Sequence, residues 1–188
     1  MTTVTQWVKK RTVMLRYNST ANIYDVRYAE EQMAKIRAAI GHVKIKEDDL
    51  VLDAGCGTGL LFECIADKAR TIVGVDLSKK TLLQAKKRVG EFLNVHLVLG
   101  DVDYLPLLPS CFSKVFAFTL LQNTPDPLRT LEEIRLVSSH DSTIVVTGLK
   151  KIFTLEVFQQ ILFKSGFEVI ALESEGVKCY IAVCKIVH

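Results

Sequence analysis

The feature that most constrains the fold is a glycine-rich turn between an apolar strand and a helix. The apolar run Leu50–Leu52 predicts a buried strand, and Asp53 closes it. Gly55, Gly57 and Gly59 follow at alternate positions, and a helical pattern begins directly afterwards. Glycine permits positive φ and carries no Cβ, so the backbone of such a turn can approach a ligand closely. Strand, glycine turn and helix form the arrangement that binds nucleotide-like ligands in α/β sheets.

The spacing of the glycines distinguishes between two kinds of ligand. A dinucleotide-binding fingerprint has glycines at positions one, three and six, and position six counted from Gly55 is Leu60. Here the third glycine is Gly59, and Asp53 stands two residues before the first. The stretch D-A-G-C-G-T-G therefore resembles the first motif of class I S-adenosylmethionine (SAM) methyltransferases. The resemblance implies that SAM is the cofactor, that S-adenosylhomocysteine is its product, and that these residues bind it: Asp53, Gly55, Cys56, Gly57 and Gly59.

After the turn, β-branched runs alternate with helical patterns. The expected strands are 71–76, 95–101, 114–121, 142–148, 167–172 and 177–185, and the expected helices are 81–89, 127–137 and 154–165. Strands separated by helices predict an α/β fold with a doubly wound, mostly parallel sheet. Counting the strand before the glycine turn, the sheet has seven strands. The resemblance implies that the C-terminal hairpin adds one antiparallel strand.

Two helices are expected ahead of this core. The first spans Val4–Leu15, with Val4, Trp7, Val8 and Leu15 on one face, and the second spans Glu30–Ile40. The Asn, Ser and Thr residues of Tyr17–Asp25 predict a loop between them. The chain is thus expected to be one domain, with a helical lid over 1–46 and a Rossmann-like core over 47–188. In the resembled family such helices cover the cofactor, and an A-x-x-Y-D element like Ala21–Asp25 implies that Tyr24 lies near the methionine end.

Polar residues end the next two strands as well. In a doubly wound sheet the ligand lies at the carboxyl ends of the strands, so these residues are candidate contacts. Asp76 ends the second strand, and its carboxylate is suited to accept hydrogen bonds from both ribose hydroxyls. Leu77 is placed to pack on the adenine face. Asp101 after the third strand is suited to accept from the adenine amine, and the Val102 N–H to donate to a ring nitrogen.

The segment after the fourth strand bears on the methyl acceptor. Leu121–Asp126 (L-Q-N-T-P-D) partly resembles the N-P-P-aromatic motif of nitrogen methyltransferases, but Thr124 and Asp126 depart from it. It also resembles the L-x-H-x-x-D-P element of small-molecule methyltransferases of quinone biosynthesis, with Asn123 in place of the histidine. We therefore expect Asn123, Gln122 and Tyr24 to shape the acceptor site, and a small-molecule acceptor is favoured. If a general base is used, the candidates are Asp126, Tyr24 and Tyr28.

Charge and composition leave some alternatives open. Up to Lys46 the chain carries nine basic and three acidic residues, against 15 and 18 in the remainder. This basic segment is either a solvated helix surface or attracts an anionic substrate such as RNA or a phosphorylated metabolite. The five cysteines form no C-x-x-C pair, so no metal site is expected. No apolar run is long enough for a membrane span and no secretory signal is seen, so a cytoplasmic location is expected.

Three further hypotheses about the function of the chain remain. One alternative is an RNA or protein acceptor that is recognised with the help of a small activator subunit. The apolar stretch Ile72–Val75 is the candidate sheet edge for binding that subunit. A non-catalytic SAM-binding subunit is another, because the sequence offers no indispensable catalytic side chain. A nicotinamide-dependent oxidoreductase is disfavoured by Leu60 at the third glycine position.

Overall fold

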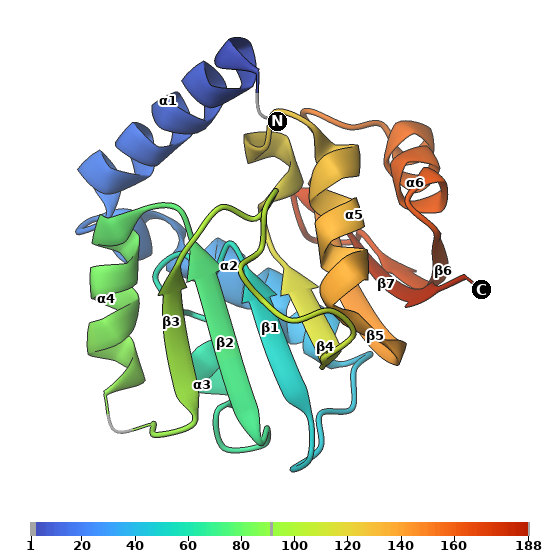
Figure 1. Ribbon diagram of the computed structural model, residues 1–188, viewed down its shortest axis with the longest axis horizontal. Helices are drawn as coiled ribbons and strands as arrows, with labels where there is room; N and C mark the ends of the chain where they lie inside the picture. The colour runs from blue at the N-terminus through green and yellow to red at the C-terminus, as the bar shows by residue number, and fades with distance from the viewer. Residues whose placement is uncertain (1–2, 91, 188) are drawn as a thin grey trace.

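A seven-stranded sheet forms the centre of the computed structural model, which describes residues 3–90 and 92–187 (Figure 1). The spatial order of the strands is β3-β2-β1-β4-β5-β7-β6. Their bounds are β1 Leu50–Ala54, β2 Thr71–Asp76, β3 Val95–Leu99, β4 Phe112–Ala117, β5 Ser138–Leu149, β6 Phe167–Glu173 and β7 Cys179–Ile186. The pairs from β3 to β5 are parallel, whereas β7 runs antiparallel to both β5 and β6. The expected sheet, with one antiparallel strand from the C-terminal hairpin, is confirmed.

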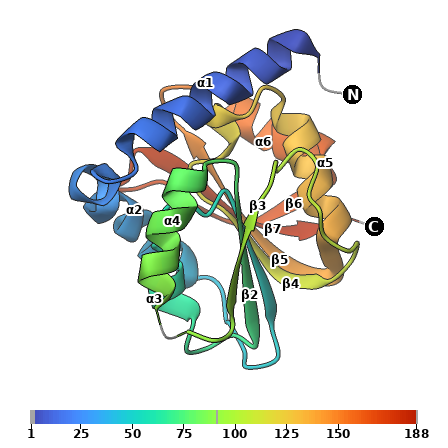
Figure 2. The same cartoon turned by 60° about the vertical axis from the view of Figure 1, so that its left-hand side comes forward.

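Helices cover both faces of the sheet (Figure 2). On one face lie α2 (Tyr24–Ile40), α3 (Phe62–Ile65) and α4 (Lys79–Val89); on the other lie α5 (Pro127–Val137) and α6 (Leu155–Lys164). The alternation of side chains along a strand produces two separate apolar clusters, because neighbouring residues point to opposite faces. Val51 belongs to the cluster under α2 and α3, and Leu52 to the cluster under α5 and α6. No helix among the described residues is long and apolar enough to cross a membrane.

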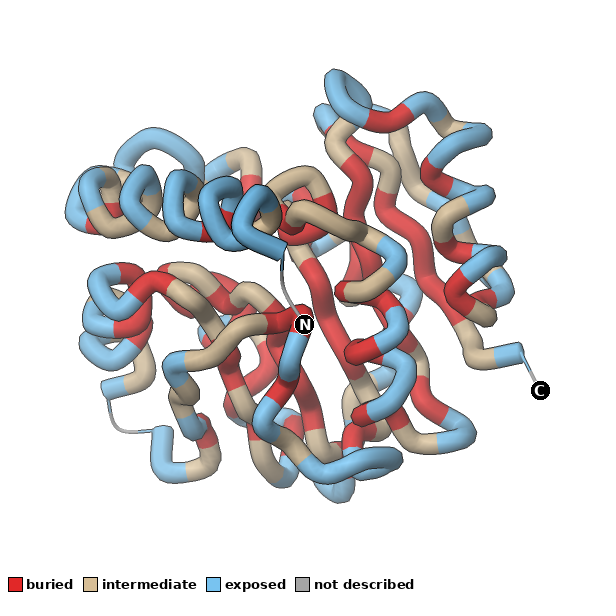
Figure 3. The backbone as a smooth tube through the Cα atoms, turned by 45° about the horizontal axis from the view of Figure 1, so that its top comes forward, coloured by how far each residue is buried: buried red, intermediate tan, exposed pale blue. Residues whose placement is uncertain are grey.

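The first helix, α1 (Val4–Thr20), lies outside these two layers. It begins with a capping box at Thr3 and runs across the carboxyl ends of the strands (Figures 1 and 3). The structure fixes which face of this helix points inward. The face carrying Val4, Trp7, Val8 and Leu15 is exposed to solvent, and Val4 retains 83% of its accessible surface. The opposite face of the helix, which carries Lys10 and Tyr17, points to the strand ends instead.

Several boundaries also differ from the predicted ones. The predicted loop Tyr17–Asp25 is mostly helical, since α1 continues to Thr20 and α2 already begins at Tyr24. Tertiary contacts account for this: the Asn18 side chain accepts from the Ser78 hydroxyl and the Lys80 N–H, so it does not compete with its own helix. The stretch Ile72–Val75 lies in β2, inside the sheet, and β3 forms that edge. The prediction that it forms an edge was therefore wrong.

The fourth strand ends four residues earlier than predicted. It stops at Ala117, and Thr119 takes a left-handed backbone conformation with φ of 55°. A short 3₁₀ helix, η1 (Leu121–Asn123), follows. Left-handed backbone is unusual for a β-branched residue and persists only where the surroundings fix it. Here the Thr119 N–H donates to the Thr147 hydroxyl, and the Thr119 hydroxyl donates to the Gln32 side chain.

Candidate functional site

A cavity of about 780 Å³, part of which opens to solvent, lies between the strand ends and α1. This main cavity is formed by segments far apart in the sequence: the glycine turn, the end of β2, the end of β3, the segment after β4, the inner face of α1, and Tyr24 of α2. A smaller hollow of about 380 Å³, the inner hollow, adjoins it between the glycine turn and α2. The site therefore lies where the order of the strands reverses, between β1 and β4.

The three glycines of the turn serve different purposes. Gly55 has φ of 77°, and its N–H donates to the Val75 carbonyl. At Gly57 a Cβ would meet no atom within 4 Å, and the residue lines both hollows, so its backbone faces open space. At Gly59 a Cβ would lie 2.6 Å from the Phe62 ring. Gly59 lines neither hollow, and we infer that it permits close packing rather than a ligand contact.

Asp76 links the glycine turn to the start of α4. One carboxylate oxygen accepts from the Gly57 N–H at 2.9 Å, and the other accepts from the Ser78 N–H at 2.8 Å and the Thr81 hydroxyl at 3.1 Å. A carboxylate offers about four lone-pair positions, so one remains for a ligand unless these bonds rearrange. Burial raises the pKa of Asp76, and the three donors counteract that shift. Asp76 lines the main cavity as expected.

Asp53 is the unpartnered acid of the site. It lines the inner hollow and is almost completely buried, yet no described residue donates a hydrogen bond to it. Burial, with a smaller contribution from the nearby Asp76, raises the pKa of Asp53 to about 8. A buried acid without a partner is costly unless a ligand supplies the missing charge or donor. The neighbouring Cys56 also lines this hollow, but its thiol packs near Gly74, and burial raises its pKa.

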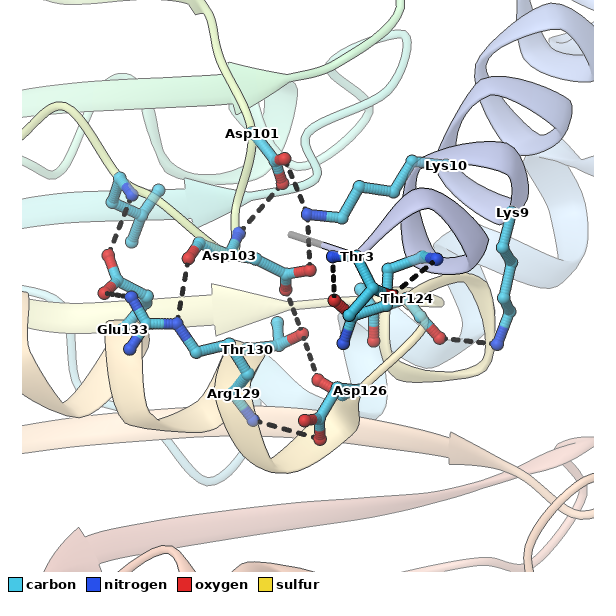
Figure 4. A network of polar contacts seen from close by, with 12 residues as sticks. Thr3, Lys9, Lys10, Asp101, Asp103, Thr124, Asp126, Arg129, Thr130 and Glu133 are labelled. Carbon is cyan, nitrogen blue, oxygen red and sulfur yellow. Dashed lines mark hydrogen bonds and ion pairs between the residues drawn. The ribbon is translucent and has the colours of Figure 1, made fainter. Parts of the chain in front are cut away.

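Lys10 from α1 pairs with two acids at the end of β3 (Figure 4). Its ammonium lies 2.6 Å from Asp101 and 2.7 Å from Asp103, and its side chain is 5% exposed. Burial opposes this charge, but the bonds to the two carboxylates outweigh it and raise the pKa of Lys10. The network continues from Asp103 to the Thr130 hydroxyl at 2.5 Å. Asp101 lines the main cavity, and its carboxylate already forms an ion pair with Lys10 there.

The remaining cofactor candidates lie where the sequence placed them. Leu77 and Val102 both line the main cavity, Leu77 beside Asp76 and Val102 beside Asp101. No group of three or more potential metal-ligating side chains occurs within residues 3–90 and 92–187.

Asn123 and Tyr24 line the main cavity, whereas Gln122 does not. The Asn123 amide nitrogen donates to the Thr119 carbonyl at 2.7 Å and to the Tyr17 hydroxyl at 3.0 Å. Its amide oxygen accepts from Arg16 at 2.6 Å. The Gln122 amide oxygen is buried and has no hydrogen-bond partner among the described residues. The structure thus brings Asn123 and Tyr24 together at this end of the cavity, and it leaves Gln122 outside.

None of the three candidate bases is placed to accept a proton there. Asp126 caps α5 by accepting from the Leu128 and Arg129 N–H groups. Tyr28 is exposed and lines neither hollow. Tyr24 lines both hollows, but burial raises its pKa well above that of a free tyrosine, so it stays protonated.

Three residues of the site were not identified from the sequence. Lys10 was counted only as part of a basic segment, Tyr17 was placed in a loop, and Thr119 was placed within a strand. One signal was available for two of them. Lys10, Val13, Met14 and Tyr17 recur at helical spacing, which puts them on one face. Nothing in the sequence indicates the left-handed backbone of Thr119.

The residues present fit an adenosyl ligand that carries an amino acid group. The unpartnered Asp53 suits an ammonium, Asp76 and Asp101 suit hydroxyl and amine donors, and the open backbone of Gly57 lets such a ligand approach.

Comparison with known protein families agrees with this geometry. Residues 51–140 match the family model of a methyltransferase domain. Malonyl-[acyl-carrier protein] O-methyltransferase of Halalkalibacterium halodurans is 31% identical over 139 residues, which are 69% of this chain and 51% of the relative. Ubiquinone biosynthesis O-methyltransferase of Thiobacillus denitrificans is 38% identical over 80 residues, or 41% and 34% of the two chains. The chain thus spans about half the length of the first relative and a third of the second.

Solved structures share the fold. A SAM-dependent methyltransferase of Aquifex aeolicus superimposes with a TM-score of 0.72 at 19% identity, over 81% of this chain and 89% of that one. A methyltransferase of Haloferax volcanii, solved in complex with the Trm112 methyltransferase activator, has a TM-score of 0.81 at 15% identity. That match covers 92% of this chain and 98% of the other.

Proposed function

We propose that this chain is a class I SAM-dependent methyltransferase domain and that its acceptor is a small molecule bound in the main cavity beneath α1. The observation that carries the proposal is the position of α1. Its inner face lines the end of the cavity beyond the glycine turn, and side-chain contacts join it to both rims. Two relatives named for the methylation of small or carrier-bound acyl and quinone compounds support the same acceptor class.

In the proposed reaction, the main task of the protein is to position SAM and the acceptor. SAM supplies a methyl group that its sulfonium already activates. Asp53 would pair with the ammonium of the methionine portion, and Asp76 would accept from the ribose hydroxyls. The wall formed by α1 would hold the acceptor near the strand ends. Bringing two reactants together in the right orientation lowers the barrier substantially, so no indispensable catalytic side chain is required.

Asp76→Ala tests the cofactor site. We expect the dissociation constant for SAM to rise about 10- to 100-fold, because the change removes hydrogen bonds to a charged acceptor and frees the Gly57 N–H. Calorimetry measures the constant, and thermal denaturation verifies that the variant is folded. Asp67→Ala is the matched control, since Asp67 is an exposed acid remote from both hollows. Equal SAM affinity of wild type and Asp76→Ala would refute the ribose contact.

Labelled SAM tests the transfer itself. Incubation with separate small-molecule, RNA and protein fractions of a cell extract should place the label in the small-molecule fraction. Binding of SAM with no transfer to any fraction would instead support a non-catalytic SAM-binding subunit.

One observation favours a second candidate. The Haloferax volcanii methyltransferase that shares nearly the whole fold is solved with an activator protein. β3 lies at an edge of this sheet, and Leu93 and Leu99 beside it are exposed. An RNA or protein acceptor reached with such a partner would place the label in the RNA or protein fraction, and only when the partner is added.

A further inference from the structure

We propose that the acceptor is a carboxylate, and that the Tyr17 hydroxyl and the cations of α1 bind it. This inference rests on the proposed methyl transfer and names the chemical class of its acceptor. It is drawn from the end of the main cavity lined by Tyr17 and Asn123, where the exposed Arg16 donates to the Asn123 amide oxygen. There the structure presents donors and positive charge, and it presents no group free to take a proton.

The hydrogen-bond directions at Asn123 are fixed by its neighbours. Arg16 can only donate, so the atom it contacts at 2.6 Å is the amide oxygen. The Thr119 carbonyl can only accept, so the atom facing it is the amide nitrogen. The second hydrogen of that nitrogen then points to the Tyr17 oxygen.

Tyr17 is therefore an acceptor in its bond to Asn123. The Arg16 guanidinium lies over the Tyr17 ring, and no described residue accepts the hydrogen of the Tyr17 hydroxyl. Because Tyr17 lines the main cavity, that O–H is available to a ligand there. Burial, the main cause, raises the pKa of Tyr17, so the hydroxyl keeps its proton and serves as a donor rather than as a base.

Two cations of α1 stand on the same rim without acidic partners. Lys9 donates to the Thr124 carbonyl at 2.7 Å (Figure 4), and Arg16 donates to the Asn123 amide oxygen. Both partners are neutral, and no described carboxylate forms an ion pair with either residue. Lys9 and Arg16 are two helical turns apart and so lie on one face of α1. Their charges attract an anion to this end of the cavity.

The acids of the cavity cannot act as a base for the acceptor. Asp101 and Asp103 hold Lys10, Asp76 accepts three hydrogen bonds, and Asp53 lines the inner hollow but not the main cavity. The described histidines line neither hollow. An acceptor that must lose a proton, such as an alcohol or a protonated amine, would find no group to take it. A carboxylate is already ionised at neutral pH.

The step balances without a base. An oxygen of the carboxylate attacks the methyl carbon, the new O–CH₃ bond forms, and the S–CH₃ bond breaks with its electron pair kept by sulfur. A negative carboxylate and a positive sulfonium become a neutral methyl ester and a neutral thioether. No proton is released. The other carboxylate oxygen would accept a hydrogen bond from the Tyr17 hydroxyl. This hydrogen bond would position the attacking oxygen.

A binding experiment tests the recognition separately from catalysis. Calorimetry on the protein saturated with S-adenosylhomocysteine compares benzoate with its neutral analogue benzamide. We expect benzoate to bind at least 10-fold more tightly, and Tyr17→Phe to remove about 10-fold of that affinity. Tyr28→Phe, an exposed tyrosine of the adjacent helix, is the matched control and should leave binding unchanged. Equal binding of the two probes, or equal effects of the two substitutions, would overturn the inference.

The products of methyl transfer provide the second test. Label transferred from SAM to small molecules should become volatile methanol after mild alkali, as methyl esters do, and an indicator dye should detect no proton release. Alkali-stable label with one proton released per methyl group would contradict the carboxylate while leaving the proposed function intact. If S-adenosylhomocysteine fails to bind, or no fraction accepts label, the proposed function fails instead.

Discussion

At the scale of the residue, Asp53 is the most informative side chain of the site. Its carboxylate is buried beside a second acid and lacks a donor, so its pKa rises to about 8. By contrast, the other buried acids of the described residues accept hydrogen bonds. Asp49, for instance, accepts hydrogen bonds from the Ser113 hydroxyl and the Lys114 ammonium. An unsatisfied buried charge is kept only where something offsets its cost, and here the proposed ligand ammonium does so.

Asp53→Asn should change how stability depends on pH. Between about pH 4 and 8 the folded protein holds a proton on Asp53 that the unfolded chain has released. The wild type without SAM should therefore lose stability as pH rises through this window, by about 1 kcal/mol per pH unit relative to the variant. Urea denaturation from pH 5 to 8.5 measures the difference. Parallel curves for the two proteins would contradict the raised pKa.

Saturating SAM provides an internal control for this experiment. The ligand ammonium favours the ionised carboxylate, so the pH-dependent difference between the proteins should shrink.

At the scale of the element, the glycine turn combines two tasks that the sequence motif does not separate. Gly57 presents open backbone to both hollows, whereas Gly59 lets Phe62 pack against the turn. The helix that follows has only four residues, Phe62–Ile65. The first N–H groups after the turn are used within it, since Gly59 donates to Cys56 and Phe62 donates to Gly59. The turn is thus stabilised by its own packing and by Asp76 rather than by a long helix.

Alanine at the two glycines should separate these tasks. Gly59→Ala places a methyl group 2.6 Å from the Phe62 ring at a φ of 80°, so we expect a loss of about 2–4 kcal/mol in the free energy of unfolding. Gly57→Ala meets no atom and should cost about 1 kcal/mol for its positive φ alone. Its methyl group projects into open space at the site, so SAM affinity should fall. Denaturation and calorimetry of both variants measure the pattern, and equal stability losses would contradict it.

At the scale of the whole molecule, α1 closes the site by joining segments far apart in the chain. Lys10 reaches Asp101 and Asp103, Arg16 reaches Asn123, and Asn18 reaches the start of α4. These contacts are polar, while the apolar face of the helix remains in solvent. A helix attached mainly by polar side chains is easier to displace than one that packs in the core.

Ligand binding should stabilise the whole fold. SAM at 100 times its dissociation constant contributes about 2.7 kcal/mol, which corresponds to a rise in Tm of roughly 5 to 11 °C for a domain of this size. NAD at the same concentration should give no shift, because the third glycine is at 59 and Leu60 fills the dinucleotide position. Differential scanning calorimetry with each ligand measures the shifts. A rise in Tm with NAD and no rise with SAM would contradict the assignment of SAM as the cofactor.

The sequence by itself determined the sheet and the acids at its ends. The β-branched runs and the intervening helices predict a mostly parallel sheet because parallel strands need crossovers, and in the structure the turn from Asp53 to Gly59 lies where the strand order reverses. Asp53, Asp76 and Asp101 line the two hollows for the same reason: each lies at or just after the carboxyl end of a strand, and parallel strands end at one edge. Their contacts with SAM stay predictions.

Only the tertiary structure decided which face of α1 points inward and how the acceptor end is built. Helical periodicity shows which residues share a face, but it does not show which face another segment will cover. The shared face of Val4, Trp7, Val8 and Leu15 stays in solvent, because two carboxylates at the end of β3 and the amide of Asn123 pair with Lys10 and Arg16 elsewhere on the helix. Those partners lie about 90 to 110 residues away in the chain, and no local pattern connects them.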